Sequence, residues 1–267
     1  MEILTFTNDA QNKGRKMSQS GARNWLDFWN GDTPIYANER HKRQHYELIA
    51  RDLAPHIPSG ASEVLDYGCG EALYAPRLAR DRGCLLLFDA AQHVRKKLRV
   101  RFGEEAGVRV LEDGALKDVA AGSLDLIVAN SLIQYIPPGE LSDLLDLWKG
   151  KLKPDGWLLL ADIPAPQGRS QAREAFDDAI ALLRFGWSGG FFLAALASLL
   201  RLFFSDYRRL RREAGFFRYS ASELESVLRE QGFEGRPLSR NIGHNQNRLA
   251  FAAQKIQSSA IAETSRP

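Results

Sequence analysis

Short apolar runs alternate with longer amphipathic segments between about residues 63 and 163. Continuous apolar strands separated by helices are typical of a parallel sheet that helices cover on both faces. The pattern therefore predicts an α/β fold with a doubly wound, mostly parallel sheet. The predicted strands end at 65, 88, 111, 129 and 161, and the predicted helices run through Leu73 and Leu78 to Gly83, over 91–102 and over 138–152.

Helical segments flank this alternating region on both sides. A helix of mixed charge is predicted from about residue 38 to 54, and Pro55 ends it because proline lacks the amide hydrogen. Residues 164–219 carry no strand pattern and are predicted to be helical, with a break at 189–190. Ser220 and Glu223 form a capping box that opens another helix, and two strands are expected at about 234–240 and 248–253.

Composition and charge exclude several classes of protein. The chain has 267 residues, which is enough for one sizeable core. Its apolar fraction of 44% is too high for a disordered chain. Lys and Arg exceed Asp and Glu by 36 to 33, so the overall charge predicts no stable nucleic-acid partner. Cys69 and Cys84 cannot build a disulfide framework or a zinc domain. The first residues resemble no secretion signal, so a cytoplasmic location is expected.

A glycine-containing turn follows the first predicted strand. Its sequence is Asp66-Tyr67-Gly68-Cys69-Gly70, and glycines let the backbone turn sharply and approach a ligand. Asp89 closes the next strand, 19 residues after Gly70, where a carboxylate can accept both ribose hydroxyls of a nucleotide-like cofactor. The plainer alternatives are that Asp66 only caps the turn, that Asp89 only caps a helix and that Tyr67 is an ordinary sheet-edge aromatic.

At these residues the sequence resembles the class I S-adenosylmethionine-dependent methyltransferases, over roughly residues 60–165. The turn resembles their acidic glycine-rich motif, with Ala72 at the place of the third glycine. Further similarity lies in Asp89, in 112–115, in 124–131 and in 152–156. The resemblance implies S-adenosylmethionine as cofactor and a terminal antiparallel hairpin, and the spacing of the cysteines and histidines predicts no metal site. The cofactor-binding residues it implies are Asp66, Tyr67, Gly68 and Gly70 at the methionine end, Asp89 and Ala90 at the ribose, Asp113 and Gly114 at the adenine, and Asn130 at the fourth strand.

The sequence pattern and the resemblance together predict how the chain is divided. The expected segments are a flexible leader (1–22), an N-terminal helical segment closing the site (23–60), a Rossmann-like cofactor-binding core (61–163), a helical cap or lid (164–219), the last helix and terminal hairpin (220–254) and a flexible tail (255–267).

A nicotinamide dehydrogenase is the main alternative for the glycine turn. Its phosphate loop needs a third glycine so that a pyrophosphate can lie on the helix N-terminus. No third glycine follows Gly68 and Gly70, and the carboxylates of Asp66 and Glu71 would repel a pyrophosphate. They suit a cationic sulfonium ligand that carries an ammonium group, so the residues favour the methyltransferase.

Candidate catalytic residues lie outside the cofactor motifs. Methyl transfer from a sulfonium is an in-line displacement in which positioning and desolvation do most of the work, and a base is optional. His244 is the first candidate base, within a polar run at 240–248, followed by His41 and Tyr135. A solvated turn at 240–248 is an equally good interpretation. His41 and His45 share one helical face, where solvated histidines are favoured over a metal pair or a role near the site.

Two segments of the sequence bear on the nature of the methyl acceptor. The fourth strand ends in Asn130-Ser131-Leu132-Ile133-Gln134-Tyr135 and lacks the Asn-Pro-Pro-Tyr pattern of relatives that methylate base amines, which disfavours nucleobases. Residues 185–200 are uncharged, and 16 residues are too few to span a membrane. The stripe on this segment is predicted to comprise Phe192, Leu196, Leu199, Leu200 and Phe203, opposite Ala194, Ala197, Ser198 and Arg201.

Two interpretations of this stripe stay open. It either packs on the core as a cap or forms an apolar lid that touches a membrane surface through 185–212, where Arg208, Arg209, Arg211 and Arg212 follow. We therefore predict methyl transfer to a small-molecule or lipid-like acceptor, in the cytoplasm or peripheral to the inner membrane. The alternatives are a non-catalytic scaffold that keeps the cofactor fold or binds a membrane surface and, as a third choice, an RNA methyltransferase.

Overall fold

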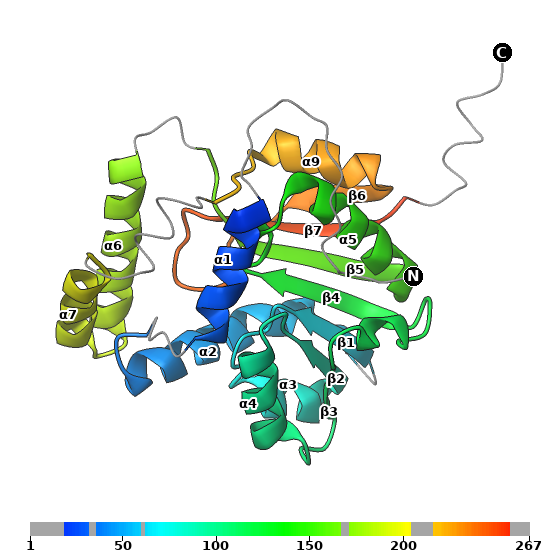
Figure 1. The fold of residues 1–267 in the computed structure, drawn as a ribbon, viewed down its shortest axis with the longest axis horizontal. Coiled ribbons are helices and arrows are strands. Elements are labelled where there is room, and N and C mark those ends of the chain that lie inside the picture. Colours follow the sequence, from blue (N-terminus) through cyan, green and yellow to red (C-terminus); the bar gives the residue numbers. More distant parts are fainter. Residues whose placement is uncertain (1–18, 32–35, 60–61, 167–170, 204–215, 257–267) are drawn as a thin grey trace.

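A computed structural model describes residues 19–31, 36–59, 62–166, 171–203 and 216–256. Seven strands form one sheet in the order β3-β2-β1-β4-β5-β7-β6 (Figure 1). The first five are parallel, and β7 runs antiparallel to both β5 and β6. This confirms the predicted doubly wound α/β fold and its terminal hairpin. The strands are β1 (Ser62–Tyr67), β2 (Gly83–Phe88), β3 (Val108–Val110), β4 (Leu124–Asn130), β5 (Leu152–Ile163), β6 (Phe233–Pro237) and β7 (Leu249–Lys255).

Helices cover both faces of the sheet, and each face has its own core. Alternate residues of β1 show the division, because Val64 packs with α2 and α3 while Leu65 packs in the cluster that holds Trp148 of α5 and Leu224 of α9. The described helices are α1 (Gln19–Asn30), α2 (Glu39–Leu53), α3 (Ala75–Arg82), α4 (Gln92–Phe102), α5 (Pro138–Lys151), α6 (Gln171–Ser188), α7 (Phe192–Phe203) and α9 (Ala221–Glu230), with short 3-10 turns at Ala54–His56, Ala115–Lys117 and Ile133–Tyr135.

Element boundaries agree with the sequence pattern in most places. Asn38 caps α2 by accepting from the His41 amide at 2.8 Å, and Ser220 with Glu223 forms the predicted capping box. The clearest difference is β5, which begins at Leu152 because residues 153–156, predicted as a turn, join the strand. Gly156 permits this, since a Cβ there would lie 2.8 Å from the Leu124 carbonyl oxygen.

The N-terminal segment lies across the carboxyl ends of the strands. Trp25 of α1 packs on Tyr135, which follows β4, with ring centroids 4.7 Å apart. At the other end of α1, the side chain of Asn30 accepts from the His93 amide at the start of α4. The helix α1 begins at Gln19, inside the predicted leader, while residues 1–18 and 257–267 of the predicted leader and tail lie outside the described residues.

The predicted cap contains a hairpin of α6 and α7, which Figure 1 shows at the side of the molecule away from α5 and α9. The two helices approach closely at Gly186, where a Cβ would lie 2.9 Å from the Cβ of Ala195. The turn between them is held to α2, because Arg40 Nε donates to the Gly189 carbonyl at 2.8 Å. The glycine break predicted at 189–190 is therefore the turn of this hairpin.

The hairpin presents a different face to the protein than the sequence predicted. Ala195 and Ser198 are buried against α6, whereas Leu196 and Leu200 are 43% and 65% exposed. The interpretation that this stripe packs on the core is therefore wrong for both leucines. Close approach at Gly186 selects small side chains for the contact and leaves the leucines outside. The basic residues at 208–212 lie outside the described residues, and no described helix has the length and apolarity needed to cross a membrane.

Candidate active site

The turn after β1 lies against the end of β2. The amides of Gly68 and Cys69 donate to the Phe88 carbonyl at 2.7 and 3.1 Å. Gly68 and Gly70 have φ angles of +81° and +57°, in the left-handed region that favours glycine. Ala72, at the place of the third glycine, has φ +42°, so the loop keeps a left-handed backbone there without glycine. The predicted glycine turn is thus built as a tight loop at the carboxyl edge of the sheet.

Asp66 lies beneath this loop, at the end of β1. Its carboxylate is buried and accepts a hydrogen bond from the Tyr74 hydroxyl. Burial raises the pKa of Asp66 to about 7, against the smaller opposing effect of that hydrogen bond. Asp66 can therefore change its charge near neutral pH.

Asp89 joins the ends of β1 and β2. Its two carboxylate oxygens accept from the amides of Gly70 at 3.0 Å and Ala91 at 2.9 Å. Each oxygen keeps a further lone pair, which two ribose hydroxyls require. Burial raises the pKa of Asp89, while the two backbone donors oppose the rise. Arg95 donates to the carbonyls of Asp89 and Ala90 at 2.7 and 2.8 Å and so fixes the turn.

The predicted adenine end is open. Asp113 is exposed, and Gly114 has φ +78° with no atom within 4 Å of a built Cβ.

Tyr67, predicted at the methionine end, is buried, with its ring 4.7 Å from Phe88 and 5.2 Å from Trp148. Burial raises the pKa of Tyr67 to about 12, with smaller contributions from the charges of Asp113 and Asp89. The Tyr67 ring therefore supports the floor of the site.

The end of β4 carries an unsatisfied acceptor. Asn130 Oδ1 is buried and has no hydrogen-bond partner among the described residues, as is also true of Gln134 Oε1. Buried polar atoms of this kind are rare and call for an explanation such as an absent ligand. Asn130 lies at the same sheet edge as the loop of Gly68, where a built Cβ would meet the side chain of Leu132 at 2.9 Å. This acceptor suits a donor group on a cofactor.

A second polar network joins β4, β5 and the loop before β7. Ser131 and Asp162 both have φ +56°, an unusual backbone for residues other than glycine. The Ser131 hydroxyl donates to Asp162, whose amide in turn donates to Asn241 Oδ1 at 2.8 Å. Asn241 Nδ2 also donates to the carbonyl of Asn245 at 2.9 Å, which holds the loop containing His244.

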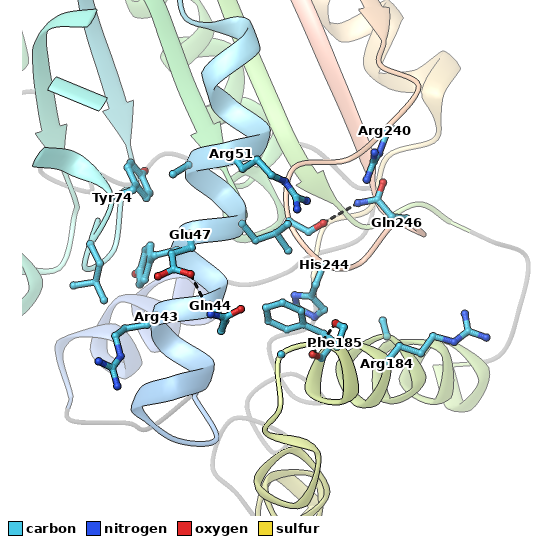
Figure 2. A pocket seen from close by; sticks show the side chains of 18 of the residues that line it. Arg43, Gln44, Glu47, Arg51, Tyr74, Arg184, Phe185, Arg240, His244 and Gln246 are labelled. Carbon is cyan, nitrogen blue, oxygen red and sulfur yellow. Dashed lines mark hydrogen bonds between the residues drawn. The ribbon is translucent and has the colours of Figure 1, made fainter. Parts of the chain in front are cut away.

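Three histidines meet beside this network. The rings of His41 and His45 lie 6.4 Å apart, and those of His45 and His244 lie 6.2 Å apart. Burial lowers the pKa of His41 to about 4 and of His45 to about 3, and also lowers that of His244. The ring of His244 stacks on Phe185 of α6 at 5.0 Å (Figure 2). The interpretation of His41 as a solvated histidine is wrong, because Phe185 and Phe191 at the tip of the hairpin pack on its ring. His45 is half-buried and its ring lies beside those of Tyr46 and His244.

The other catalytic candidate lies elsewhere. Tyr135 packs with Trp25 and Phe216, at centroid distances of 4.7 and 5.4 Å, beneath α1. The structure therefore brings His41 and His244 together and places Tyr135 in a separate aromatic cluster. No group of three or more His, Cys, Asp or Glu side chains in the described part of the chain is arranged to hold a metal ion.

Glu71, whose carboxylate was expected to repel a pyrophosphate, lies beside two cations. Glu71 is paired with Lys42 at 3.0 Å and with Arg101 at 3.2 Å, and these partners lower its pKa against the opposing effect of burial. Its charge is therefore largely compensated, so Glu71 would not repel a pyrophosphate as expected. The preference for a cationic ligand depends on Asp66 instead.

Several site residues were missed because their partners are distant in sequence. Asp162 and Asn241 are 79 residues apart, and Tyr46 Oη accepts from the Glu71 amide at 2.9 Å across 25 residues. The position of Asp162 at the carboxyl end of β5 was the one available indication, since ligands bind at that edge in open α/β sheets.

The fold, the strand order and the polar strand ends define the class as class I S-adenosylmethionine-dependent methyltransferases. The family described as "Methyltransferase domain" matches residues 37–238, more than half of the chain. The chain belongs to this methyltransferase-domain family, which confirms the resemblance and the cofactor class that it implies.

Individual relatives are more distant. An uncharacterized methyltransferase from Mycobacterium tuberculosis is 28% identical over 127 residues, covering 47% of this chain and 61% of the relative. A Mycobacterium bovis counterpart matches to the same extent. The chain thus spans less than two thirds of the length of these curated relatives.

Solved structures agree in fold. A Haemonchus contortus phosphoethanolamine N-methyltransferase, in complex with phosphoethanolamine and S-adenosylhomocysteine, has TM-score 0.58 at 15% identity, covering 90% of this chain and 49% of that chain. A Leishmania major S-adenosylmethionine-dependent methyltransferase has TM-score 0.56 at 12% identity, covering 91% and 87%. At these identities the similarity shows the fold alone.

Proposed function

We propose that the chain transfers a methyl group from S-adenosylmethionine to a small-molecule or lipid-like acceptor. The observation that carries the proposal is the set of cofactor-type groups gathered at one edge of the sheet. Asp66 and the glycine loop would hold the methionine end, Asp89 the ribose, and Asn130 Oδ1 a donor of the cofactor. The residues present fit this cofactor, since an orphaned acceptor and an open position at Gly114 lie where it would bind.

The protein's contribution to the reaction is positioning, desolvation and removal of a proton. The cofactor supplies an electrophilic methyl group on a sulfonium, and the acceptor displaces it in line. Helix α1 lies across the strand ends and would exclude water from the reacting groups. His244 is neutral at physiological pH because burial lowers its pKa, so its ring can accept a proton from the acceptor.

Calorimetry tests the proposal directly. S-adenosylmethionine and S-adenosylhomocysteine should bind with micromolar affinity, while NADH and NADPH, as controls, should not bind. Absence of binding by both adenosyl ligands would favour the alternative of a non-catalytic scaffold that keeps the fold.

The lipid-like acceptor is supported by an apolar patch on the hairpin. We define this patch as Phe176, Trp187, Leu193, Leu196 and Leu200, whose exposed fractions lie between 43% and 78%. Together these side chains expose roughly 600 Å² of apolar surface on the two helices of the hairpin. A stable dimer buries about 800 Å² on each partner, more than the patch offers. Exposed Trp and Leu side chains on a helix fit the interface of a bilayer, which makes a lipid surface the favoured occupant.

Vesicle flotation tests the patch. The protein should float with anionic vesicles of phosphatidylglycerol and phosphatidylcholine, and the double substitution Trp187→Ser and Leu200→Ser should abolish flotation. Val100→Ser is the matched control, because Val100 is 90% exposed on α4, outside the patch. Absence of flotation by the unaltered protein, or formation of a dimer that the double substitution dissociates, would contradict membrane contact.

A further inference from the structure

A groove of about 1480 Å³ lies between α2, α6 and the loop that joins β6 to β7 (Figure 2). Its lining contains five arginines and only two acidic residues. The arginines are Arg43 and Arg51 of α2, Arg77 of α3, Arg184 of α6 and Arg240 of the loop, and the acids are Glu47 and Asp177. The groove is therefore lined with an excess of positive charge, although the whole chain is nearly neutral.

Most of these arginines have no acidic partner among the described residues. Arg51 pairs with Asp52 at 3.1 Å, but the other four make no ion pair with the described residues. Some cations outside the groove are paired, as in Arg248 with Asp178 at 3.0 Å and Lys153 with Asp125 at 2.6 Å. Unpaired guanidinium groups around one concave surface focus a positive potential that attracts anions.

The groove also reaches His244, the predicted catalytic base. Tyr46, Tyr74 and His244 line it, and Tyr74 is the hydrogen-bond donor to Asp66. His244 lies within electrostatic range of Asp162, at the carboxyl end of β5. A molecule in the groove can therefore place an anionic group among the arginines and an uncharged part against the aromatic side chains of Tyr46 and Tyr74.

We propose that this groove binds a phosphate group of the methyl acceptor, with Arg184 and Arg240 as its principal ligands. The inference rests on the proposed function and deepens it by naming the chemical class of the substrate. Figure 2 shows Arg43, Arg184 and Arg240 on three different elements that border the groove, with Arg184 and Arg240 on the side of His244 away from Arg43. Guanidinium groups bind phosphate through two parallel hydrogen bonds, and several unpaired arginines match a doubly charged group better than a single carboxylate.

The phosphate can belong to a soluble metabolite or to a lipid headgroup, and two probes distinguish these sources. The first probe is inorganic phosphate, titrated against the protein by ³¹P NMR at constant ionic strength with chloride as the competing anion. The second consists of vesicles of phosphatidic acid in phosphatidylcholine, compared with pure phosphatidylcholine. Saturable binding of inorganic phosphate indicates a soluble source, while binding of phosphatidic acid vesicles alone indicates a lipid.

Substitutions locate the binding. The double substitution Arg184→Gln and Arg240→Gln should weaken binding of the effective probe at least about tenfold, because each removes a charge-assisted hydrogen bond. Arg229→Gln is the matched control, since Arg229 is an exposed arginine of α9 that does not line the groove. All these arginines are exposed, so the variants should fold normally, which circular dichroism verifies.

Two results would overturn the inference: no saturable binding of either probe, or equal weakening by Arg229→Gln. Calorimetry with S-adenosylhomocysteine on the same preparations tests the proposed function independently of phosphate binding. Normal cofactor binding without phosphate binding would remove the groove assignment and leave the methyltransferase in place. Phosphate binding without cofactor binding would leave the groove as a phosphate site and remove the proposed methyl transfer.

Discussion

The affinity for S-adenosylhomocysteine should depend on pH through Asp66. If this carboxylate holds the ammonium group of the ligand, only its ionised form binds well. Because burial raises the pKa of Asp66 to about 7, roughly one molecule in eleven is ionised at pH 6 and about three in four at pH 7.5. The affinity should therefore rise about eightfold between these values. The pKa values of His41, at about 4, and His45, at about 3, lie below this window because burial lowers both.

Asp66→Asn separates this effect from others. The variant should bind at least about tenfold more weakly at pH 7.5, because it loses a charge-assisted hydrogen bond, and its affinity should not change between the two pH values. Calorimetry at pH 6 and pH 7.5 measures both proteins. An unaltered protein with equal affinities at the two pH values, or a variant that keeps the same pH dependence, would refute the reasoning.

Asp66→Asn should weaken ligand binding but should not lower the free energy of unfolding at pH 7.5. The folded chain keeps a proton on Asp66 up to about pH 7, whereas the unfolded chain loses it near pH 4. The free energy of unfolding therefore falls as pH rises between these values, by up to about 4 kcal/mol, and is level above pH 7. Asp66→Asn removes this decrease, so urea unfolding without ligand should show a variant at least as stable at pH 7.5. A variant that loses both stability and binding would indicate a structural role alone.

Three further predictions concern other residues. Asp89→Ala should leave a folded protein with S-adenosylhomocysteine affinity reduced about a hundredfold by calorimetry, because a carboxylate placed to accept from two ribose hydroxyls is lost; unchanged affinity would remove the ribose assignment. Gly156→Ala should lower the free energy of unfolding by about 1–3 kcal/mol in urea, owing to the 2.8 Å approach to the Leu124 carbonyl, whereas Gly150→Ala, with open space, should not. His244→Gln should lower the rate of methyl transfer while cofactor affinity stays the same, and an unaffected rate would exclude its role as base.

Local patterns predicted the core of this fold well. The end of β1, the glycine turn and Asp89 follow from short-range chemistry, because a buried strand, a tight loop and a carboxylate each carry their own sequence requirements. The parallel, doubly wound arrangement of the sheet also followed from the alternation of strands and helices, whereas the order of the strands was not predicted. The start of β5 was misplaced because Pro154 and Gly156 are typical of turns, and only the neighbouring β4 explains why this backbone continues as strand.

The histidine cluster and the hairpin could not be predicted in the same way. His41 is buried because Phe185 and Phe191 pack on it from about 150 residues further along the chain, with the Phe191 ring 4.9 Å from His41. The buried face of α7 depends on how closely Gly186 lets α6 approach, which amphipathic spacing alone does not contain. Packing between distant segments overrode the local pattern in both cases.

The left-handed backbone at Ala72, Ser131 and Asp162 has a consequence for directed evolution. All three residues adopt at the carboxyl edge of the sheet a conformation that costs about 1 kcal/mol or more outside glycine. A library selected only for heat resistance should therefore accumulate Ala72→Gly, Ser131→Gly and Asp162→Gly. The last two substitutions remove the hydroxyl and the carboxylate that connect β4 to the loop of His244. The selected variants should therefore be more thermostable and less active.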